Sequence, residues 1–142
     1  MCLTLNKRYK KNTAKKDIVV YKVLFKHFTY DIEIDKFDTM FETIYQHSII
    51  KIDEIYESNF TIRNSISSGF PEVHKGLHSY KYIDDAIMEA SGWMATTFIA
   101  KCIIPKGSEY YVNGKYVPYF GNPSKQYASN KLKYIKIVLD NK

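Results

Sequence analysis

Cysteine is scarce in this 142-residue chain, which contains only Cys2 and Cys102. Two cysteines so far apart provide neither the paired spacing of a zinc site nor a disulfide framework. The histidines include one i, i+4 pair, His74 and His78, but Gly76 between them disfavours a helix that would align both rings on a metal. We therefore expect a reducing compartment, no metal, and a core position for Cys102, which lies in an apolar run.

Long hydrophobic runs and catalytic signatures are also missing. No apolar segment reaches the roughly 18 residues of a membrane helix, and the N-terminus lacks the apolar core of a secretory signal. The chain contains no nucleophile elbow, P-loop or dinucleotide-binding fingerprint. These absences predict a cytoplasmic protein without a cofactor, and they favour a binding protein over an enzyme while leaving enzymatic activity open.

Aromatic and charged residues are present in an uneven distribution. There are 13 Tyr and 8 Phe against one Trp, and the net charge is +6. The first 16 residues carry six basic side chains and no acid, which leaves 15 basic and 15 acidic residues in the rest. Residues 31–57 hold eight acids and two lysines, and residues 99–142 hold eight lysines and two acids. Opposite charges on one domain favour a homo-oligomer as readily as nucleic-acid binding.

The first 16 residues are predicted to form a flexible basic arm, although Leu3 and Leu5 could add a short strand. The positive charges of this arm could contact nucleic acid or a host protein. They could equally well increase solubility or bind an acidic patch on a second copy of the chain. The basic residues concerned are Lys7, Arg8, Lys10, Lys11, Lys15 and Lys16. Residues 17–142 have the length of a single domain of ordinary size.

Strands dominate the first half. The β-branched and aromatic segment 17–28, "DIVVYKVLFKHF", is predicted to be a strand, and the alternating segment 29–37 is its expected partner. Asp38 could then cap a short helix, before a further alternating strand over 48–56. The Ser, Asn, Gly and Pro content of residues 59–71 indicates a loop.

The second half contains the clearest helix. A strand over 73–80 leads to a helix that begins near Ile83, carries Asp84 and Asp85 in its first turn, and ends at Gly92. Four elements follow: a buried strand over 95–105, a turn over 105–108, a hairpin over 109–120 with an Asn113-Gly114 turn, and a closing strand over 127–140. This order predicts an α+β domain, mainly antiparallel sheet with one or two short helices.

Four segments together resemble a group of small bacteriophage and mobile-element proteins for which no activity is established. The segments are "DIVVYKVL", "GLHSYKYIDDA", "CIIPKGSEYY" and "ASNKLKYIKIV". The resemblance covers most of the chain after residue 16, apart from roughly residues 30–70. It implies a phage-type accessory protein in the host-cell cytoplasm, with host-directed roles such as counter-defence.

The order of these segments is also similar to the ADP-ribosyltransferase fold. In that fold a strand with Arg or His is followed by a Tyr-bearing strand and helix, and then by a strand with a catalytic Glu. Here the first strand offers Tyr21 and Lys22, and the nearby glutamate is Glu109, in a turn. The likeness implies a related shape and an NAD-using enzyme as one alternative, but the catalytic residues are not matched.

Tyrosines and lysines gather in two segments, "GLHSYKY" and "PKGSEYY". Aromatic rings beside lysines suit base stacking with phosphate neutralisation, and the Lys-Gly-Ser turn offers backbone N–H groups to an anion. We therefore predict a ligand-binding site at His78, Tyr80, Lys81, Tyr82, Lys106, Ser108 and Tyr110. Core packing, cross-strand aromatic pairs, a solvated turn lysine and a structural histidine would explain the same residues without a ligand.

The leading hypothesis is a non-enzymatic, phage-type accessory protein that binds a small anionic or nucleotide-like ligand. An inhibitor or adaptor that contacts protein or nucleic acid through the basic arm is the second hypothesis. An ADP-ribosyltransferase-like enzyme that uses NAD is the third.

Overall fold

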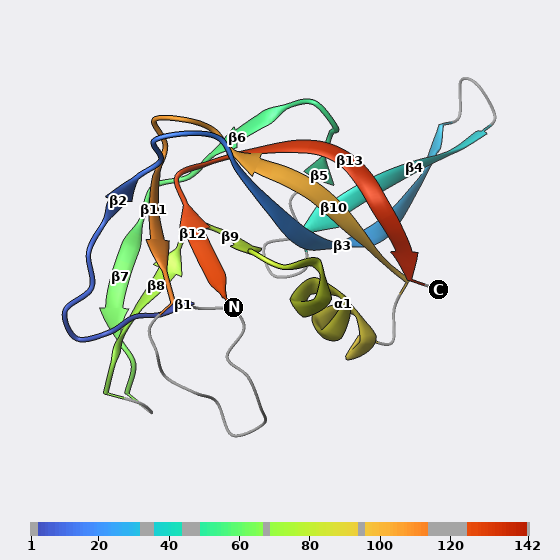
Figure 1. Ribbon diagram of the computed structural model, residues 1–142. Helices are drawn as coiled ribbons and strands as arrows, with labels where there is room; N and C mark the ends of the chain where they lie inside the picture. The colour runs from blue at the N-terminus through green and yellow to red at the C-terminus, as the bar shows by residue number, and fades with distance from the viewer. Residues whose placement is uncertain are drawn as a thin grey trace.

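Runs of β-branched and aromatic residues place most of the chain in antiparallel strands, as a computed structural model shows (Figure 1). The structure describes residues 3–31, 36–43, 49–66, 69–93, 96–113 and 125–141. Its strands are β1 (Leu3–Thr4), β2 (Asn12–Thr13), β3 (Ile18–Asp31), β4 (Lys36–Thr43), β5 (Ile49–Ile50), β6 (Ile55–Glu57), β7 (Thr61–Asn64), β8 (Pro71–Lys75), β9 (Leu77–Tyr80), β10 (Thr97–Ile104), β11 (Glu109–Val112), β12 (Gln126–Ser129) and β13 (Lys131–Asn141).

One nine-residue helix, α1 (Ile83–Ser91), completes the elements of the described residues. The predicted antiparallel sheet is therefore confirmed, whereas the α+β class is met only loosely because so little of the described chain is helical. None of that helical content is long and apolar enough to cross a membrane.

The strands form two sheets. A small one has the order β1-β8-β7, and a larger one has the order β2-β11-β12-β9-β3-β10-β13-β6. The long strand β3 lies at the centre of the larger sheet and pairs with β10 from Ile18 to Phe25. Its second half pairs with β4 from Leu24 to Asp31, and this hairpin extends beyond the rest of the sheet (Figure 1).

The helix packs on one face of the larger sheet, where side chains at alternate positions of β3 meet it. Ala86 and Ala90 of α1 are buried against Val23 of β3 and Ile99 of β10. Asp84 and Asp85 lie in its first turn, as predicted, where the helix dipole favours negative charge. Small residues on its inner face let the helix lie close to the strands.

The opposite face of the same strands has a core of its own. Val20 and Leu24 of β3 pack there with Cys102 of β10 and with Leu132 and Tyr134 of β13. Cys102 is fully buried, which confirms its predicted core position. A third cluster joins the small sheet to the larger one through Leu3, Leu5, Val73, Tyr111 and Ala128.

The segment predicted as a flexible arm is tied into the sheets instead. Leu3 pairs with Val73, and the Leu5 N–H donates to the Pro71 carbonyl at 2.8 Å. Asn12 and Thr13 form β2 and pair with β11. Leu3 and Leu5 are 0% and 1% exposed, so the burial of two leucines explains why this basic segment is held in place.

Two other element predictions are wrong. Asp38 does not cap a helix, because it lies within β4 and pairs with Thr29. The predicted loop over 59–71 contains strand β7, whose backbone pairs with β8. Pairing with a neighbouring strand outweighed local propensity in both places.

Several predicted strands need finer boundaries. The strand over 73–80 is divided at Gly76, where an added Cβ would lie 3.2 Å from the Phe60 ring. The closing strand is divided at Asn130 into β12 and β13. The predicted turn residue Gly114 and part of the predicted strand over 29–37 lie outside the described residues.

Candidate functional site

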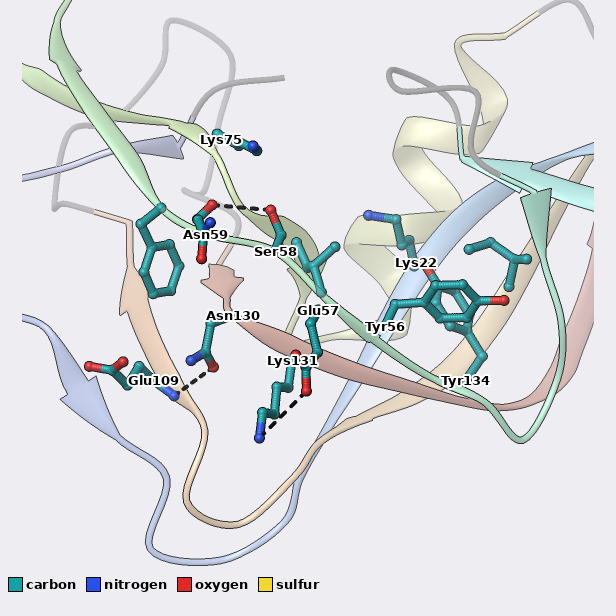
Figure 2. Close-up of a pocket in the computed structure, with 13 residues that line it drawn as sticks. Lys22, Tyr56, Glu57, Ser58, Asn59, Lys75, Glu109, Asn130, Lys131 and Tyr134 are labelled. Carbon is teal, nitrogen blue, oxygen red and sulfur yellow. Dashed lines mark hydrogen bonds and ion pairs between the residues drawn. The ribbon is translucent and has the colours of Figure 1, made fainter.

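A pocket of about 610 Å³ lies on the face of the sheet opposite α1 (Figure 2). It gathers residues from the central strand β3, from the edge strand β6 and the residues that follow it, and from four other segments. The lining residues are Lys22, Ile50, Tyr56, Glu57, Ser58, Asn59, Phe60, Lys75, Leu77, Glu109, Asn130, Lys131 and Tyr134. This volume falls within the usual range for small-molecule sites.

One wall is the segment that runs from β6 toward β7. Backbone pairing of Tyr56 with Leu132 fixes β6 along β13. The Ser58 N–H then donates to the Asn130 carbonyl at 2.9 Å, which keeps the following Asn59 and Phe60 beside the pocket. This wall therefore depends on strand pairing between segments about 75 residues apart.

Lys22 has an unusual position within this pocket. Its neighbours on the same face of β3 are Val20 and Leu24, which are fully buried. The Lys22 Nζ donates a hydrogen bond to the His78 carbonyl at 2.7 Å. Figure 2 shows its side chain between Ser58 and the tyrosine pair of the pocket.

Burial lowers the pKa of the Lys22 ammonium, while smaller effects of Cys102 and Glu89 oppose that shift. Among the described residues the ammonium has one hydrogen-bond acceptor and no carboxylate within ion-pair distance. A protonated lysine carries three N–H donors. Two donors of Lys22 are therefore left without a protein acceptor at the edge of a pocket.

Two titratable groups that interact with Lys22, His78 and Cys102, are neutral at neutral pH. Burial, together with the nearby Lys22 charge, lowers the pKa of His78 to about 4. The ring of His78 lies with Nε2 at 3.3 Å from the Val73 carbonyl. Burial raises the pKa of the Cys102 thiol to about 12, so this thiol supplies no negative charge to the lysine.

Two tyrosines form the apolar side of the pocket. The rings of Tyr56 and Tyr134 meet edge to face, with centroids 5.5 Å apart. Tyr134 is 1% exposed, and burial raises its pKa well above the usual value. The Tyr56 hydroxyl accepts the Lys51 N–H at 2.8 Å, which fixes the orientation of this ring at the pocket edge.

The charges around the pocket leave an excess of positive charge. Glu57 is paired with Lys131 at 3.7 Å, and Glu109 is paired with Lys11 at 2.6 Å. Both carboxylates of the lining are thus compensated by lysines. Lys22 and the exposed Lys75 have no such partner among the described residues, so the pocket suits a ligand with negative charge.

None of the seven residues predicted as a ligand site lines this pocket. Tyr80 is buried beneath α1 and is 7% exposed. Tyr82 precedes the helix and is 53% exposed, and the Lys81 Nζ lies 5.1 Å from the centre of its ring. His78 contributes its backbone carbonyl to Lys22, but its side chain is not part of the lining.

The predicted residues of the segment "PKGSEYY" also take part in the packing and hydrogen bonding of the fold. The Lys106 backbone N–H donates to Asp17 Oδ1 at 2.8 Å. Ser108 is buried, and its hydroxyl has no hydrogen-bond partner among the described residues. Tyr110 packs edge to face on Tyr127 with ring centroids 5.6 Å apart. These contacts hold the turn and the β11–β12 pair together.

Strand register places Lys81 and Lys106 at opposite ends of the strands β9, β12 and β11. β12 lies between β9 and β11, and its Ser129 pairs with both Leu77 and Tyr110. Lys106 precedes β11 at that end. Lys81 follows β9 at the other end, where Tyr80 pairs with Gln126. Lys81 and Lys106 therefore do not share one pocket, and ligand binding by either group stays a prediction.

The two segments do supply direct neighbours of the predicted residues to the pocket. Leu77 precedes His78, and Glu109 lies between Ser108 and Tyr110; both residues line it. Side chains alternate between the faces of a strand, so a shift of one residue changes the face. The predicted residues are thus neighbours of two lining residues without lining the pocket themselves.

Sequence reasoning did not identify Lys22 as a site residue. The signal that could have found it is the alternation of Val20, Lys22 and Leu24, in which one charged residue occupies an apolar face. The wall residues of 56–59 carried no such signal, because that segment was interpreted as the end of a strand and the beginning of a loop.

Comparisons with family models, with curated proteins and with solved structures find no significant match to this chain. Within the part of the chain that the structure describes, no group of three or more His, Cys, Asp or Glu residues could hold a metal ion. The geometry of the pocket therefore carries the functional argument.

Proposed function

We propose that this protein binds a small anionic ligand in the pocket and that Lys22 contacts the negative charge of the ligand. The observation that carries this proposal is the ammonium of Lys22, which has three donors and, among the described residues, one protein acceptor at 2.7 Å. An unpaired charge inside a protein is costly. A ligand oxygen beside Lys22 would satisfy its remaining donors with charge-assisted hydrogen bonds.

The rest of the lining supports a ligand with both polar and apolar parts. Ser58, Asn59 and Asn130 offer neutral donors and acceptors, while Phe60 and Leu77 offer apolar surface. Lys75 adds positive charge at the rim. Phe60 already meets the Tyr111 ring edge to face at 4.9 Å, which holds its orientation.

A nucleotide-like ligand is the finer form of this proposal. A base could stack on Phe60 while its phosphate meets Lys22, and base–aromatic stacking contributes about 1–3 kcal/mol. The phage-type setting and a counter-defence role follow from the sequence resemblance, and they stay predictions together with the identity of the ligand.

The test is calorimetric titration of the wild-type protein with inorganic phosphate and with adenosine monophosphate. Replacing Lys22 by Met retains the length of the side chain and removes the charge, so we expect the affinity to fall at least about tenfold, as for loss of a hydrogen bond to a charged group. The matched control is Lys101→Met. Lys101 is also part-buried, lies on the adjacent β10 and pairs with Tyr21, on the face toward α1.

Equal affinities of the wild type and of Lys22→Met would contradict the proposal, as would a loss of affinity in Lys101→Met of the same size. Adenosine monophosphate that binds no more tightly than phosphate would contradict the nucleotide-like form alone.

The exposed basic side chains of the N-terminal segment support the second hypothesis, an inhibitor or adaptor. Its backbone is tied into the sheets, but all six of its basic residues are exposed. Of these, Lys11 is paired with Glu109, and Lys7 lies 5.9 Å from the centre of the Phe70 ring. Replacing Arg8, Lys10, Lys15 and Lys16 by Gln should weaken nucleic-acid binding and reduce its salt dependence if this hypothesis holds.

Deletion of the whole segment would not test that hypothesis, because it would remove the buried Leu3 and Leu5.

The third hypothesis, an NAD-using enzyme, is tested by NAD consumption in the wild type and in Glu109→Gln. Glu109 lines the pocket, but its carboxylate is engaged by Lys11.

A further inference from the structure

Lys22 combines three features. Its amine is at the edge of a pocket, it is held at one point by a backbone carbonyl, and it has no carboxylate partner among the described residues. Burial favours the neutral amine, which has a free electron pair. A lysine amine in such surroundings is a nucleophile toward carbonyl compounds.

We infer that Lys22 forms a reversible imine with the carbonyl group of a small ligand in this pocket. The inference shares the pocket with the proposed function and does not require the ligand to be an anion. It adds a covalent step to what would otherwise be a purely electrostatic contact.

The step is a condensation without oxidation or reduction. The neutral amine attacks the carbonyl carbon, a C–N bond forms, and the carbonyl oxygen takes up a proton to give a carbinolamine. The hydroxyl then leaves as water while the nitrogen forms a C=N double bond. Amine and carbonyl compound are thereby converted into imine and water, and hydrolysis reverses the reaction.

The hydrogen-bonding partners at Lys22 favour the product. The free ammonium has three N–H donors and one protein acceptor, the His78 carbonyl at 2.7 Å. A protonated imine has a single N–H, and this one donor matches that one acceptor. Condensation therefore removes two donors that have no acceptor among the described residues, and an unpaired donor is costly where water does not reach it.

The lining can accommodate the group that the imine carries. Leu77 and Ile50 provide apolar surface in the same lining, and Ser58 provides a hydroxyl. Figure 2 shows Lys22 and Ser58 on facing sides of the same space. A second lysine of the lining, Lys75, is exposed to solvent.

The experiment is reductive trapping in the wild-type protein at pH 7 with sodium cyanoborohydride and a limiting amount of aldehyde. Propanal is the neutral probe and glyoxylate the anionic one. Peptide mass spectrometry then gives the labelling of Lys22 relative to Lys101, the part-buried lysine on the other face of the sheet. We expect labelling at Lys22 to exceed that at Lys101 at least about fivefold.

Lys22→Arg has no primary amine at this position and cannot form an imine, so the adduct at residue 22 should be absent from this variant. Trapping in the wild type decides the question even if this variant does not fold.

The outcomes separate the imine from the proposed anion binding. Labelling of Lys22 no faster than that of Lys101 with both probes would overturn the imine, whatever the result of the phosphate titration. Preferential labelling by propanal and glyoxylate alike supports the imine and counts against selection of the ligand by charge. A preference for glyoxylate supports the imine and the anionic ligand together.

Discussion

Val23 and Lys22 are neighbours on β3, yet they face opposite environments. Val23 packs on Ala86 and Ala90 of α1, in a cluster that is apolar throughout. Lys22 lies on the other face, beside an apolar core and at the edge of a pocket. The helix-covered face is filled by the packing of α1 on the strands. The pocket face brings a lysine to the edge of a cavity, and the proposed function depends on that lysine.

The strongest way to separate the two faces is to remove a buried side chain from each. Ile99→Ala beneath α1 and Leu132→Ala behind the pocket wall should each lower the free energy of unfolding by about 2–5 kcal/mol, because both residues are 0% exposed. Only Leu132→Ala should also weaken phosphate binding, since Leu132 pairs with Tyr56 of the wall. Urea unfolding and calorimetry measure the two effects, and equal loss of binding in both variants would contradict the distinction.

Acid should destabilise the protein through His78, whose carbonyl holds Lys22. The pKa of His78 is about 4 in the folded protein against about 6.5 when unfolded, so the unfolded chain binds more protons between these values. The free energy of unfolding should therefore fall as the pH falls from about 6.5 to 4, by about 1–2 kcal/mol after allowance for the partial exposure of the ring.

His78→Gln isolates this effect from the titration of the carboxylates. Urea unfolding at pH 4.5 and 7 should show a smaller loss of stability in His78→Gln than in the wild type. An identical loss in both would show that His78 does not contribute.

Lys22→Met should make the protein more stable by about 1 kcal/mol, because it removes a charge without a counter-ion from a site beside the core. The lowered pKa of Lys22 also means that wild-type stability rises with pH until the unfolded lysine titrates near 10.5, and this rise should be smaller in the variant. Thermal unfolding from pH 7 to 10 measures both effects. A loss of stability in Lys22→Met would indicate a structural role for the ammonium.

The smallest effect is expected at the rim of the pocket. Lys131 and Glu57 are both substantially exposed and 3.7 Å apart, so Lys131→Ala should change the free energy of unfolding by less than about 0.5 kcal/mol. Phosphate binding should weaken by about two- to threefold at low salt and be unchanged at high salt. A salt-independent loss would mean that Lys131 contacts the ligand directly.

The sequence predicted the helix and most strands because their patterns are local. Alternation in "VVYKVLF" and the helical spacing of Ile83, Ala86 and Ala90 each follow from a few neighbouring residues. The predictions at Asp38 and over 59–71 were wrong because strand pairing decided those segments. Pairing partners lie elsewhere in the chain, where local propensity gives no information.

The candidate site was harder to predict, since clusters of Tyr and Lys mark the site region and the sheet core alike. Tyr80 and Tyr110 were expected to contact a ligand. In the structure they pack beneath α1 and on Tyr127, and a ligand contact stays a prediction. Lys22 lies between two apolar residues on one face of its strand, and the sequence alone does not show which groups surround it.

By itself, the sequence determined that this is a mostly antiparallel protein with a short helix, and it determined which residues share a face of each strand. Only the tertiary structure decided what covers each face. Lys22, Tyr56 and Tyr134 come from strands far apart in the chain, and backbone pairing brings them to one pocket. Alternation fixes the direction of a side chain, but its surroundings, and therefore its charge state and chemistry, depend on which distant segments pack against it.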